Sequence, residues 1–507
     1  MSHHSARRAG AALFLALALS ACGPKTPPAI APAPPGAVAA SIPIGSLAGE
    51  LDRIFGAPAF DRMQWGVLVR SLASGQVLYE RNASKLMMPA SNMKIVTLAA
   101  AAERLGWDYT WPTRVTPAGP VADGVLTGDL VITGAGDPTI NSRAGEATAV
   151  FQKWADLLLA TGLRRIDGRI VGDARAFDDE ELGAGWAWDD MAYDYSAPVS
   201  ALQFNEDVAQ VLLRPGTVVG APASLELTPA ESGLVVDNQV TTGPGDRASV
   251  SLRRLPGSDR LVVAGSIGRL MKEAKRLVSV DTPSAYFARA LRQVLVSRGI
   301  EVTGPAVDAR ALDVKPVLDG VAPLFVHQSP PLSEAARVLM KVSQNLYAET
   351  FLKTIGAVAG EGGNTGAGQR EVARVLQGWG IPPEEYILAD GSGLSRYNYL
   401  TPNMLVTILQ RIYRDPRHRD PFIATLPVGG QDGGTIEKRF KGSRAAGNVK
   451  AKTGSLANVR SLSGYVTSLD GEPLVFSMIA NSFTLPQQAI DANIDRAVEC
   501  LANLTRR

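Results

Sequence analysis

Three short motifs in this 507-residue chain carry side chains that could together cleave an amide bond. In the first, Ser91 and Lys94 lie three residues apart in an apolar stretch, 89–106, which predicts a helix that Ser91 caps. A serine hydroxyl becomes an effective nucleophile when a neighbouring base takes its proton. Lys94 could be that base, because burial disfavours a charged lysine and a second cation in the same cleft, Lys452, would act in the same direction.

The second motif places Ser343 two residues before Asn345, within a sequence that predicts one long amphipathic helix beginning at Ser333. Serine and asparagine are poor helix formers, so their presence in a packed helix needs a reason. If the pair faces a cleft, Ser343 could relay a proton to a leaving amine and Asn345 could hold a substrate amide. The alternative is a polar turn on the protein surface.

The third motif, Lys452-Thr453-Gly454, lies in a predicted strand at the edge of the cleft. An edge strand can accept an extended peptide as an additional strand, and Gly454 would let that peptide approach closely. Lys452 and Thr453 could bind a carboxylate, while the backbone N–H of Ser455 could form an oxyanion hole with that of Ser91. A lysine on an edge strand can also serve solubility alone.

Other hydrolytic chemistries find little support in the sequence. Neither a G-x-S-x-G nor an H-E-x-x-H motif occurs, so a serine–histidine–aspartate triad and a zinc peptidase site are not indicated. The two histidines outside the N-terminal segment, His327 and His418, are expected at the surface. We therefore predict neither a metal nor a cofactor.

The elements that must position the three motifs are an antiparallel sheet and its flanking helices. A hairpin over 66–79 leads into the first motif, and two strands about the Asp470-Gly471 turn precede a closing helix over 487–504. Both chain ends are therefore expected to build one sheet, which makes the fold class α+β. Between them, 107–324 contains short strands punctuated by glycine and proline, together with two helical stretches, and is interpreted as an insertion.

The N-terminus has the features of an exported protein. Two arginines precede an apolar run, 11–19, that is too short to span a bilayer as a permanent helix, which predicts a signal peptide over 1–21. The sequence Leu-Ser-Ala-Cys ending at Cys22 resembles the lipobox of bacterial lipoproteins, so Cys22 is expected to be acylated, although an ordinary signal peptide remains an alternative. Residues 22–45 are rich in proline and alanine and predict an extended tether.

The overall charge does not point to a polyanionic partner. The chain has 51 lysines and arginines against 49 aspartates and glutamates, a formal net charge of +2, and 46% hydrophobic residues. This balance is that of an ordinary globular protein and does not indicate a nucleic-acid partner. Cys500 is expected to be a small core residue.

The order S-x-x-K, S-x-N, K-T-G resembles the class C low-molecular-weight penicillin-binding proteins, the D-Ala-D-Ala carboxypeptidase/endopeptidases of bacterial cell walls. The resemblance extends to four further stretches, at 128–140, 193–207, 388–402 and 429–440. It implies a penicillin-binding-protein/β-lactamase-like transpeptidase domain, formed by 46–106 and 325–507. It also implies that the mostly β insertion at 107–324 forms two nested domains, the inner one at about 206–267.

The resemblance also implies a role for each motif residue. Ser91 would be the acylated nucleophile and Lys94 its general base, with Ser343 relaying protons and Asn345 binding a substrate amide. The terminal carboxylate of the substrate would be held by Lys452 and Thr453.

The resemblance further implies a binding site for a diaminopimelate side chain. Its residues would be Asp190 and Tyr195 of the insertion, with Leu394 and Arg396 of the stretch at 388–402. One departure from the family pattern is Gln344, at a position where aspartate is common.

The implied function is periplasmic hydrolysis of peptidoglycan stem peptides, inhibited by β-lactams that acylate the serine. The implied location is the periplasmic side of a Gram-negative outer membrane, with the lipid on Cys22 as the anchor. Two alternatives stay open: a secreted serine β-lactamase, and a catalytically silent lipoprotein that only binds peptidoglycan. The lifetime of a penicilloyl adduct would identify the first, and failure to label with a fluorescent penicillin the second.

Overall fold

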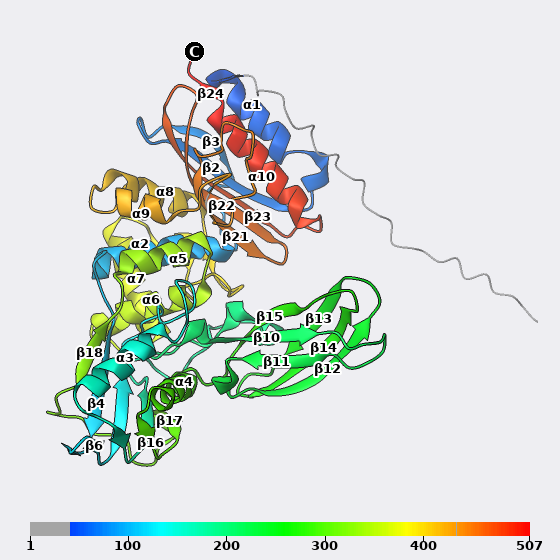
Figure 1. Ribbon diagram of the computed structural model, residues 1–507. Coiled ribbons are helices and arrows are strands. Elements are labelled where there is room, and N and C mark those ends of the chain that lie inside the picture. The colour runs from blue at the N-terminus through cyan, green and yellow to red at the C-terminus, as the bar shows by residue number, and fades with distance from the viewer. Residues whose placement is uncertain (1–40, 432) are drawn as a thin grey trace, which may run out of the picture. The chain divides into compact units, whose positions relative to one another are not determined.

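A computed structural model describes residues 41–431 and 433–507 (Figure 1). The predicted signal peptide, Cys22 and the tether up to residue 40 lie outside the described residues. Among the described helices, none has both the length and the apolar content needed to cross a bilayer.

Both ends of the chain build one five-stranded antiparallel sheet in the order β21-β22-β23-β2-β3. The strands are β2 Gln64–Ser71, β3 Val77–Arg81, β21 Lys450–Leu456, β22 Val459–Thr467 and β23 Pro473–Asn481. In the centre, β2 pairs with β23 over eight residues, from Gln64 opposite Asn481 to Ser71 opposite Leu474. The predicted α+β class and the contribution of both chain ends to one sheet are confirmed.

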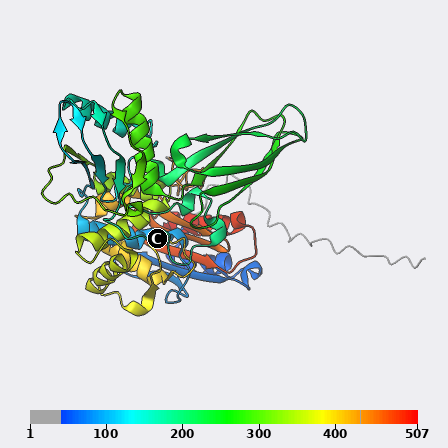
Figure 2. The same ribbon diagram turned by 90° about the horizontal axis from the view of Figure 1, so that it is seen from below.

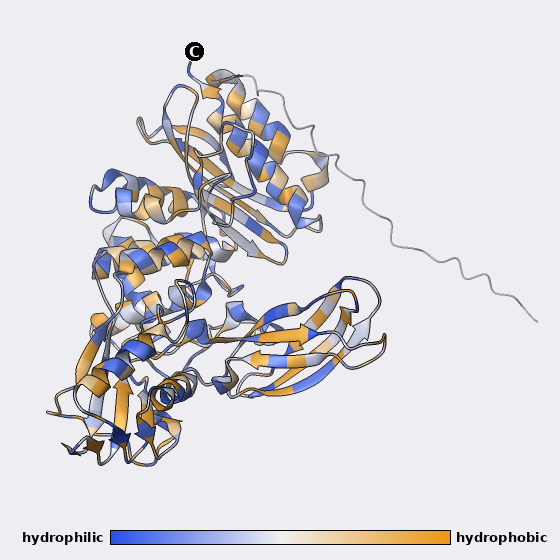
Figure 3. Cartoon of the chain, viewed as in Figure 1, coloured by the Kyte–Doolittle hydropathy of each residue, from blue (hydrophilic) through white to orange (hydrophobic). Residues whose placement is uncertain are grey.

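Helices cover the sheet, and this explains why its central strands are buried. On one side lie α1 Ile44–Phe55 and α10 Gln487–Ala502, which pack against each other beside the strands (Figure 1). In Figure 3, α10 carries both apolar and polar colouring, in agreement with a buried stripe that includes Ile490, Ile494 and Val498. Cys500 is partly buried against the same core. Beside these helices, β1 Ile42–Pro43 pairs in parallel with β24 Leu504–Thr505.

A second helical layer contains the first two motifs. Its helices are α2 Met93–Leu105, α5 Leu332–Lys341, α6 Asn345–Val358, α7 Thr365–Gly378, α8 Pro402–Arg414 and α9 Arg419–Thr425. The short strands β19 Tyr386–Ile387 and β20 Tyr399–Leu400 lie within the connection between α7 and α8 and pair with each other on either side of the loop at 388–398. From Met93 to Ala102, α2 is buried on every side, because α6, α7 and α8 pack around it. A helix that is apolar all round is expected to lie in such a core.

The middle of the chain forms a mixed five-stranded sheet, β17-β9-β7-β4-β18, and a smaller sheet, β16-β8-β6-β5. Their elements are β4 Pro112–Ala118, β5 Val121–Ala122, β6 Val125–Leu126, β7 Asp129–Thr133, β8 Arg165–Ile166, β9 Ile170–Asp173, β16 Glu301–Val302, β17 Ala306–Asp308 and β18 Phe325–Gln328, with helices α3 Ala149–Ala160 and α4 Pro283–Ser297. Since β18 pairs with β4, this sheet extends past residue 324, where the insertion was predicted to end.

Within this region, six strands form two further three-stranded sheets, β11-β10-β15 and β12-β14-β13. Their bounds are β10 Val208–Arg214, β11 Ser224–Thr228, β12 Val235–Gly243, β13 Ala248–Arg253, β14 Arg260–Gly268 and β15 Ala274–Ser279. Figures 1 and 2 both show these strands, in green, grouped together. Because β15 pairs with β10, the pairing continues past residue 267, the predicted limit of the inner domain. The division of the chain into domains stays a prediction.

Candidate active site

The three motifs meet around one cavity of about 550 Å³. Its walls come from an inserted segment at 185–195, the connection between α5 and α6, the loop at 393–396 and strand β21. The lining residues are Ser91, Gly185, Ala187, Asp190, Tyr195, Ser343, Asn345, Gly393, Leu394, Arg396, Thr435, Thr453, Ser455, Leu456, Ala457 and Gln487. Most of the predicted site residues are therefore in the lining, whereas Lys94, Lys452 and Gly454 are not.

Lys94 is fully buried directly behind Ser91. Its Nζ lies 3.0 Å from Ser91 Oγ, 2.6 Å from Asn345 Oδ1 and 2.7 Å from the carbonyl oxygen of Ser392. The amide and carbonyl oxygens can only accept hydrogen bonds. A neutral Lys94 amine that donates to both of them therefore turns its lone pair toward Ser91, which is the arrangement needed to accept the serine proton.

The electrostatic environment of Lys94 favours this neutral form. Burial lowers the pKa of Lys94 to about 7, while the carboxylates of Asp390 and Glu349 act in the opposite direction. For Lys452, burial lowers the pKa well below its ordinary value, and the charge of Lys94 lowers it further. The sequence argument anticipated the effect of burial on Lys94 but not the two buried carboxylates.

Ser91 does not cap the helix, contrary to the sequence prediction. It lies in the 3-10 turn η2, Ala90–Asn92, and the N-cap residue of α2 is Asn92, which makes no side-chain capping bond. The Ser91 hydroxyl is thus left to Lys94 and the cavity. Placing the serine one turn ahead of the helix keeps its side chain exposed to a ligand.

The second motif also departs from the prediction, because no single helix spans it. Helix α5 ends at Lys341 and α6 begins at Asn345, with Gln344 as its N-cap. Ser343 has a φ of 65°, which is incompatible with a right-handed helix. This break directs Ser343 Oγ to within 2.8 Å of Lys452 Nζ, from which it accepts a hydrogen bond.

Asn345 connects Lys94 to the inserted region. Its Oδ1 accepts from Lys94, and its Nδ2 donates to the carbonyl oxygen of Tyr195 at 2.7 Å. Both polar atoms of the amide thus already have protein partners. A substrate amide at this position would have to share or replace one of them.

In the third motif, β21 is the edge strand of the sheet, as predicted. Thr453 lines the cavity and its Oγ1 donates to Thr435 Oγ1 at 2.8 Å. Gly454 serves a different purpose from the predicted one. A Cβ atom there would lie 2.1 Å from Ser461 Oγ and 2.6 Å from the carbonyl oxygen of Pro89, so the glycine allows β21 to pack against the turn that carries Ser91.

The four residues expected to recognise a diaminopimelate side chain all line the cavity. Tyr195 donates its hydroxyl to Asp190 Oδ1 at 2.7 Å, and burial together with this carboxylate raises the pKa of Tyr195. Arg396 is exposed and donates to the carbonyl oxygen of Ala457 at 3.2 Å. Among the described residues, the cavity wall therefore includes the carboxylate of Asp190 and the guanidinium of Arg396.

Two buried carboxylates were missed by the sequence reasoning. Glu349 of α6 accepts hydrogen bonds from the backbone N–H groups of Gly391 and Ser392. Asp390 accepts from the N–H groups of Gly393 and Ser395 and from the indole of Trp186 in the inserted region. Together they fix the loop that presents the Ser392 carbonyl to Lys94. An acid within an apolar helix was the signal that could have revealed Glu349.

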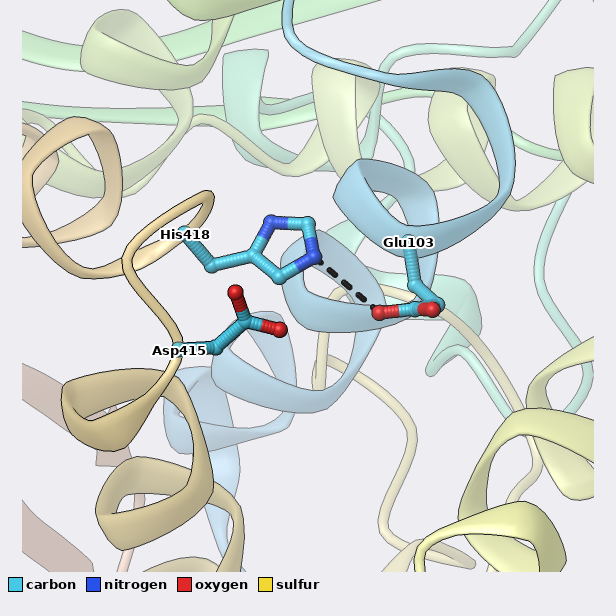
Figure 4. Close-up of side chains that lie close together, drawn as sticks. All are labelled: Glu103, Asp415 and His418. Atoms are coloured by element: carbon cyan, nitrogen blue, oxygen red, sulfur yellow. Dashed lines mark hydrogen bonds and ion pairs between the residues drawn. The ribbon is translucent and has the colours of Figure 1, made fainter.

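His418 is buried, so its prediction as a surface residue is wrong. Figure 4 shows its ring beside Glu103 and Asp415. The Trp107 indole, which can only donate, gives its N–H to His418 Nδ1 at 3.1 Å, so the neutral ring carries its proton on Nε2, 3.0 Å from Glu103 Oε2. A metal on Nε2 would require a proton on Nδ1, facing the indole N–H. The cluster therefore fits a hydrogen-bonded link between α2 and the α8–α9 connection.

The other histidine, His327, is partly buried, with its Nε2 3.5 Å from Asp137 Oδ2. It belongs to β18 in the inserted sheet. Neither histidine is in the lining of the cavity.

Comparison with known proteins agrees with this geometry. The model of the D-Ala-D-Ala carboxypeptidase 3 (S13) family matches residues 47–504. D-alanyl-D-alanine carboxypeptidase of Actinomadura sp. (strain R39) is 34% identical over 452 residues, which cover 86% of this chain and 81% of that protein. D-alanyl-D-alanine carboxypeptidase DacB of Haemophilus influenzae is 28% identical over 426 residues, covering 83% and 85% of the two chains.

The fold comparison gives the same result. The crystal structure of penicillin binding protein 4 (dacB) from Haemophilus influenzae aligns with a TM-score of 0.77 at 26% identity, covering 90% of this chain and 98% of that chain. These findings confirm the predicted resemblance to class C low-molecular-weight penicillin-binding proteins and the predicted enzyme class, a serine-type D-Ala-D-Ala carboxypeptidase. With its family model matched over almost the entire described chain, the protein belongs to the D-Ala-D-Ala carboxypeptidase 3 (S13) family.

Proposed function

We propose that the enzyme cleaves the bond after a D-alanine in peptidoglycan stem peptides through an acyl-enzyme on Ser91, with Lys94 as the general base. The proposal covers removal of a terminal D-alanine and cleavage of the D-alanine–diaminopimelate cross-link. The observation that carries it is the placement of Lys94: a buried amine with a pKa of about 7, held by two acceptors so that its lone pair meets Ser91.

In the acylation step, Ser91 Oγ forms a bond to the substrate carbonyl carbon while its proton passes to Lys94 Nζ. The backbone N–H groups of Ser91 and Ser455 stabilise the oxyanion. As the C–N bond breaks, Ser343 passes a proton to the departing amine and draws one from Lys452. Water then attacks the ester carbonyl carbon and gives a proton to Lys452 through Ser343. As the C–O bond to Ser91 breaks, Ser91 Oγ takes its proton back from Lys94, so both lysines return to their starting states.

The terminal carboxylate of the substrate is assigned to Lys452 and Thr453. A bound carboxylate favours the charged form of a neighbouring amine, so substrate binding raises the pKa of Lys452. Lys452 then takes up a proton from solvent and passes it through Ser343 to the leaving group. Asn345 contacts the substrate amide by exchanging its bond to the Tyr195 carbonyl.

A diaminopimelate side chain ends in an ammonium and a carboxylate. Asp190 suits the first and Arg396 the second, with Leu394 and the ring of Tyr195 against the methylene groups. Penicillin binding protein 4 of Haemophilus influenzae has been crystallised in complex with a β-lactam, a structure that aligns with this chain at a TM-score of 0.72. By analogy, β-lactams are proposed to acylate Ser91.

Digestion of purified muropeptides tests this proposal. Wild-type enzyme is expected to release D-alanine from pentapeptide monomers, to convert cross-linked dimers to monomers, or both, and the ratio measures the two activities. The matched control is Ser91→Ala, which keeps the cavity but has no nucleophile. Absence of both products with wild-type enzyme, or equal products with the variant, would contradict the proposal.

Rapid β-lactam turnover is not expected. Among the described residues that line the cavity, Asp190 is the one carboxylate, and it already accepts from Tyr195. Glu349 is held by backbone N–H groups of the loop behind Lys94. Since none of the described lining residues offers a free carboxylate to activate water, a penicilloyl adduct should persist for many turnovers of a peptide substrate, which intact-mass measurements over time can establish.

The cellular location belongs to the same proposal. We place the enzyme in the periplasm, anchored to the outer membrane by a lipid on Cys22, because the sequence before Cys22 resembles a lipobox and Gly23 follows it. Intact mass of protein extracted from membranes should show a lipid adduct that the Cys22→Ala variant lacks. A mature mass without a lipid would reject the anchor and leave the catalytic proposal untouched.

A further inference from the structure

The connection between α5 and α6 requires contacts with other parts of the protein to hold its conformation. It places Ser343 beside Lys452 and Asn345 beside Lys94, yet Ser343 has a left-handed backbone and the segment follows the end of one helix and precedes the start of another. Such a conformation persists only where surrounding contacts determine it. The contacts of Gln344, the residue between the two, are therefore informative.

Both ends of the Gln344 amide are engaged. Its Oε1 accepts from the N–H of Leu346 and caps α6, while its Nε2 donates to Glu206 Oε2 at 2.7 Å. Glu206 belongs to the inserted region, 138 residues earlier in the chain. The aspartate that is common at this position in the family could cap α6 but could not donate to Glu206, and it would place two carboxylates together. Gln344 can therefore cap α6 and donate a hydrogen bond to Glu206 at the same time.

Glu206 is itself held rigidly. Asn205, Glu206 and Asp207 all have positive φ, at 53°, 58° and 54°, a run that L-residues rarely adopt. The turn is fixed by Asn205, whose N–H donates to the Ile140 carbonyl, and by Asp207, whose carboxylate accepts from the N–H of Phe204. The Glu206 side chain is only 11% exposed.

The charge of Glu206 has a second partner. Arg143 binds its carboxylate with both Nε and Nη2, the latter at 2.8 Å. The guanidinium orients the Glu206 carboxylate as the acceptor for Gln344. Glu206 Oε2 is therefore presented to the α5–α6 connection by two features. One is the left-handed backbone at Asn205, Glu206 and Asp207, and the other is the ion pair with Arg143.

We propose that Glu206 is a positioning residue for the reaction: through Gln344 it fixes the α5–α6 connection, so that Ser343 and Asn345 meet Lys452 and Lys94. Before substrate binds, the Tyr195 carbonyl, which accepts from Asn345 Nδ2, also holds Asn345 against the same inserted region. The insertion is thereby part of the catalytic apparatus and not an appendage to it. This inference rests on the proposed acyl-enzyme mechanism.

An exchange of the two side chains tests the proposal. In Gln344→Glu the cap of α6 is retained, but two carboxylates face each other, so the rate of acylation by a fluorescent penicillin should fall about 10- to 100-fold, the scale on which small displacements of catalytic groups act. In the double variant Gln344→Glu/Glu206→Gln the hydrogen bond can form again, with the amide now at position 206 as donor and the carboxylate at position 344 as acceptor. Its rate should return to within about threefold of wild type.

The single variant Glu206→Gln removes the negative charge at this position and keeps the size of the side chain. Loss of the charged acceptor should slow acylation several-fold and leave the melting temperature nearly unchanged, since a hydrogen bond of the same shape can still form. The matched control is Glu226→Gln on β11, which removes an acid paired with Arg214 in the same inserted region and should acylate at the wild-type rate.

The outcomes separate this inference from the proposed mechanism. If wild-type enzyme is not acylated at Ser91, the mechanism fails. If wild type is acylated but Gln344→Glu reacts at the same rate, or the double variant recovers none of the loss, the positioning role of Glu206 is overturned. Recovery in the double variant supports it if Gln344→Glu alone already melts at the wild-type temperature, because the lower rate of that variant then does not come from a loss of folded protein.

Discussion

At the scale of single residues, the chemistry depends on how Lys94 is solvated by the protein. The sequence identified the lysine and its apolar surroundings, and burial indeed lowers its pKa to about 7. What spacing along the chain could not predict was the pair of oxygens that hold it, from Asn345 and from Ser392, because these arrive from segments about 250 and 300 residues away.

The first prediction concerns pH. Neutral Lys94 is the reactive form, so the acylation rate should rise with pH through about 7 and level off above it, falling about tenfold per unit on the acid side. Rates measured with a fluorescent penicillin between pH 5 and 9 would show this. A flat profile would contradict the role of Lys94 as the base.

Lys94 also makes the stability of the folded protein increase with pH. The pKa of Lys94 in the folded protein is lower than in the unfolded chain, where the ordinary value of 10.5 applies. Between about pH 7 and 10.5 the unfolded state therefore binds more protons, and Lys94 contributes an increase of stability with pH across that window.

A second residue-scale prediction concerns Gly454. The substitution Gly454→Ala should reduce acylation strongly and lower the free energy of unfolding by about 1–3 kcal/mol, because its Cβ would overlap Ser461 Oγ and the Pro89 carbonyl. Gly49→Ala in α1 is the matched control, since a Cβ there meets no atom within 4 Å and alanine favours a helix. Equal melting temperatures for the two variants would be inconsistent with close packing of β21 on η2.

At the scale of elements, α6 and the loop beyond it act as a unit. The amphipathic pattern predicted the helices correctly in type but joined α5 and α6 into one. The break arises from tertiary contacts, of Ser343 with Lys452 and of Gln344 with Glu206. Such contacts leave no trace in the spacing of hydrophobic residues along the segment, so the sequence pattern could not predict the break. The hairpins and the closing helix, whose signals are local, were predicted well.

The third prediction addresses the loop that Glu349 holds. Glu349→Gln removes a carboxylate that, when ionised, raises the pKa of Lys94. Because burial and the neighbouring Asp390 raise the pKa of Glu349 itself to about 7, the acid limb of the acylation profile should move only modestly to lower pH. The variant should also be less stable by about 1–3 kcal/mol, because backbone N–H groups of Gly391 and Ser392 lose a full acceptor.

Comparing pH profiles of wild type and Glu349→Gln decides the matter. Glu361→Gln is a suitable control, because Glu361 is an ion-paired acid of the α6–α7 connection that accepts from Arg370 and Arg374. A shift of the acid limb to higher pH in Glu349→Gln would show that the carboxylate does not act on Lys94 as described.

At the scale of the whole molecule, the inserted region reaches the catalytic residues through a few polar contacts. The contacts described above at Gln344, Asn345 and Asp390 are joined by one between Gln203 and Thr350 of α6. None of these contacts involves a residue of the six strands in the two inner sheets. Arg254, in the connection between β13 and β14, nevertheless donates a hydrogen bond to the carbonyl oxygen of Met191, the residue after Asp190. The sequence resemblance placed Asp190 and Tyr195 of the insertion in the site, but it could not predict the polar contacts of the insertion with Gln344, Asn345 and Asp390.

The fourth prediction is that most of the inner sheets can be removed without loss of acylation. Ala209 and Val278 are paired across β10 and β15, so an Asn-Gly turn can replace residues 210–277. Penicillin acylation should stay within about tenfold of wild type, whereas preference for diaminopimelate-containing peptides should fall, because the support of Arg254 for the Asp190 segment is lost.

Parallel measurement of penicillin acylation and of peptide hydrolysis with diaminopimelate or lysine at the third position would test this. The single variant Arg254→Ala should reproduce the loss of preference in the full chain. Abolished acylation in a shortened protein that still melts cooperatively would contradict the prediction.

The pairing of β2 with β23 joins residues more than four hundred positions apart, and the Lys452 strand lies next to the same late-made strands. A ribosome therefore finishes the segment with the nucleophile long before the segment that shapes its cleft exists. While the polypeptide is still being made, the serine has no partner strand and the proposed site cannot form. The carboxypeptidase can therefore become active only when almost the last codon has been translated.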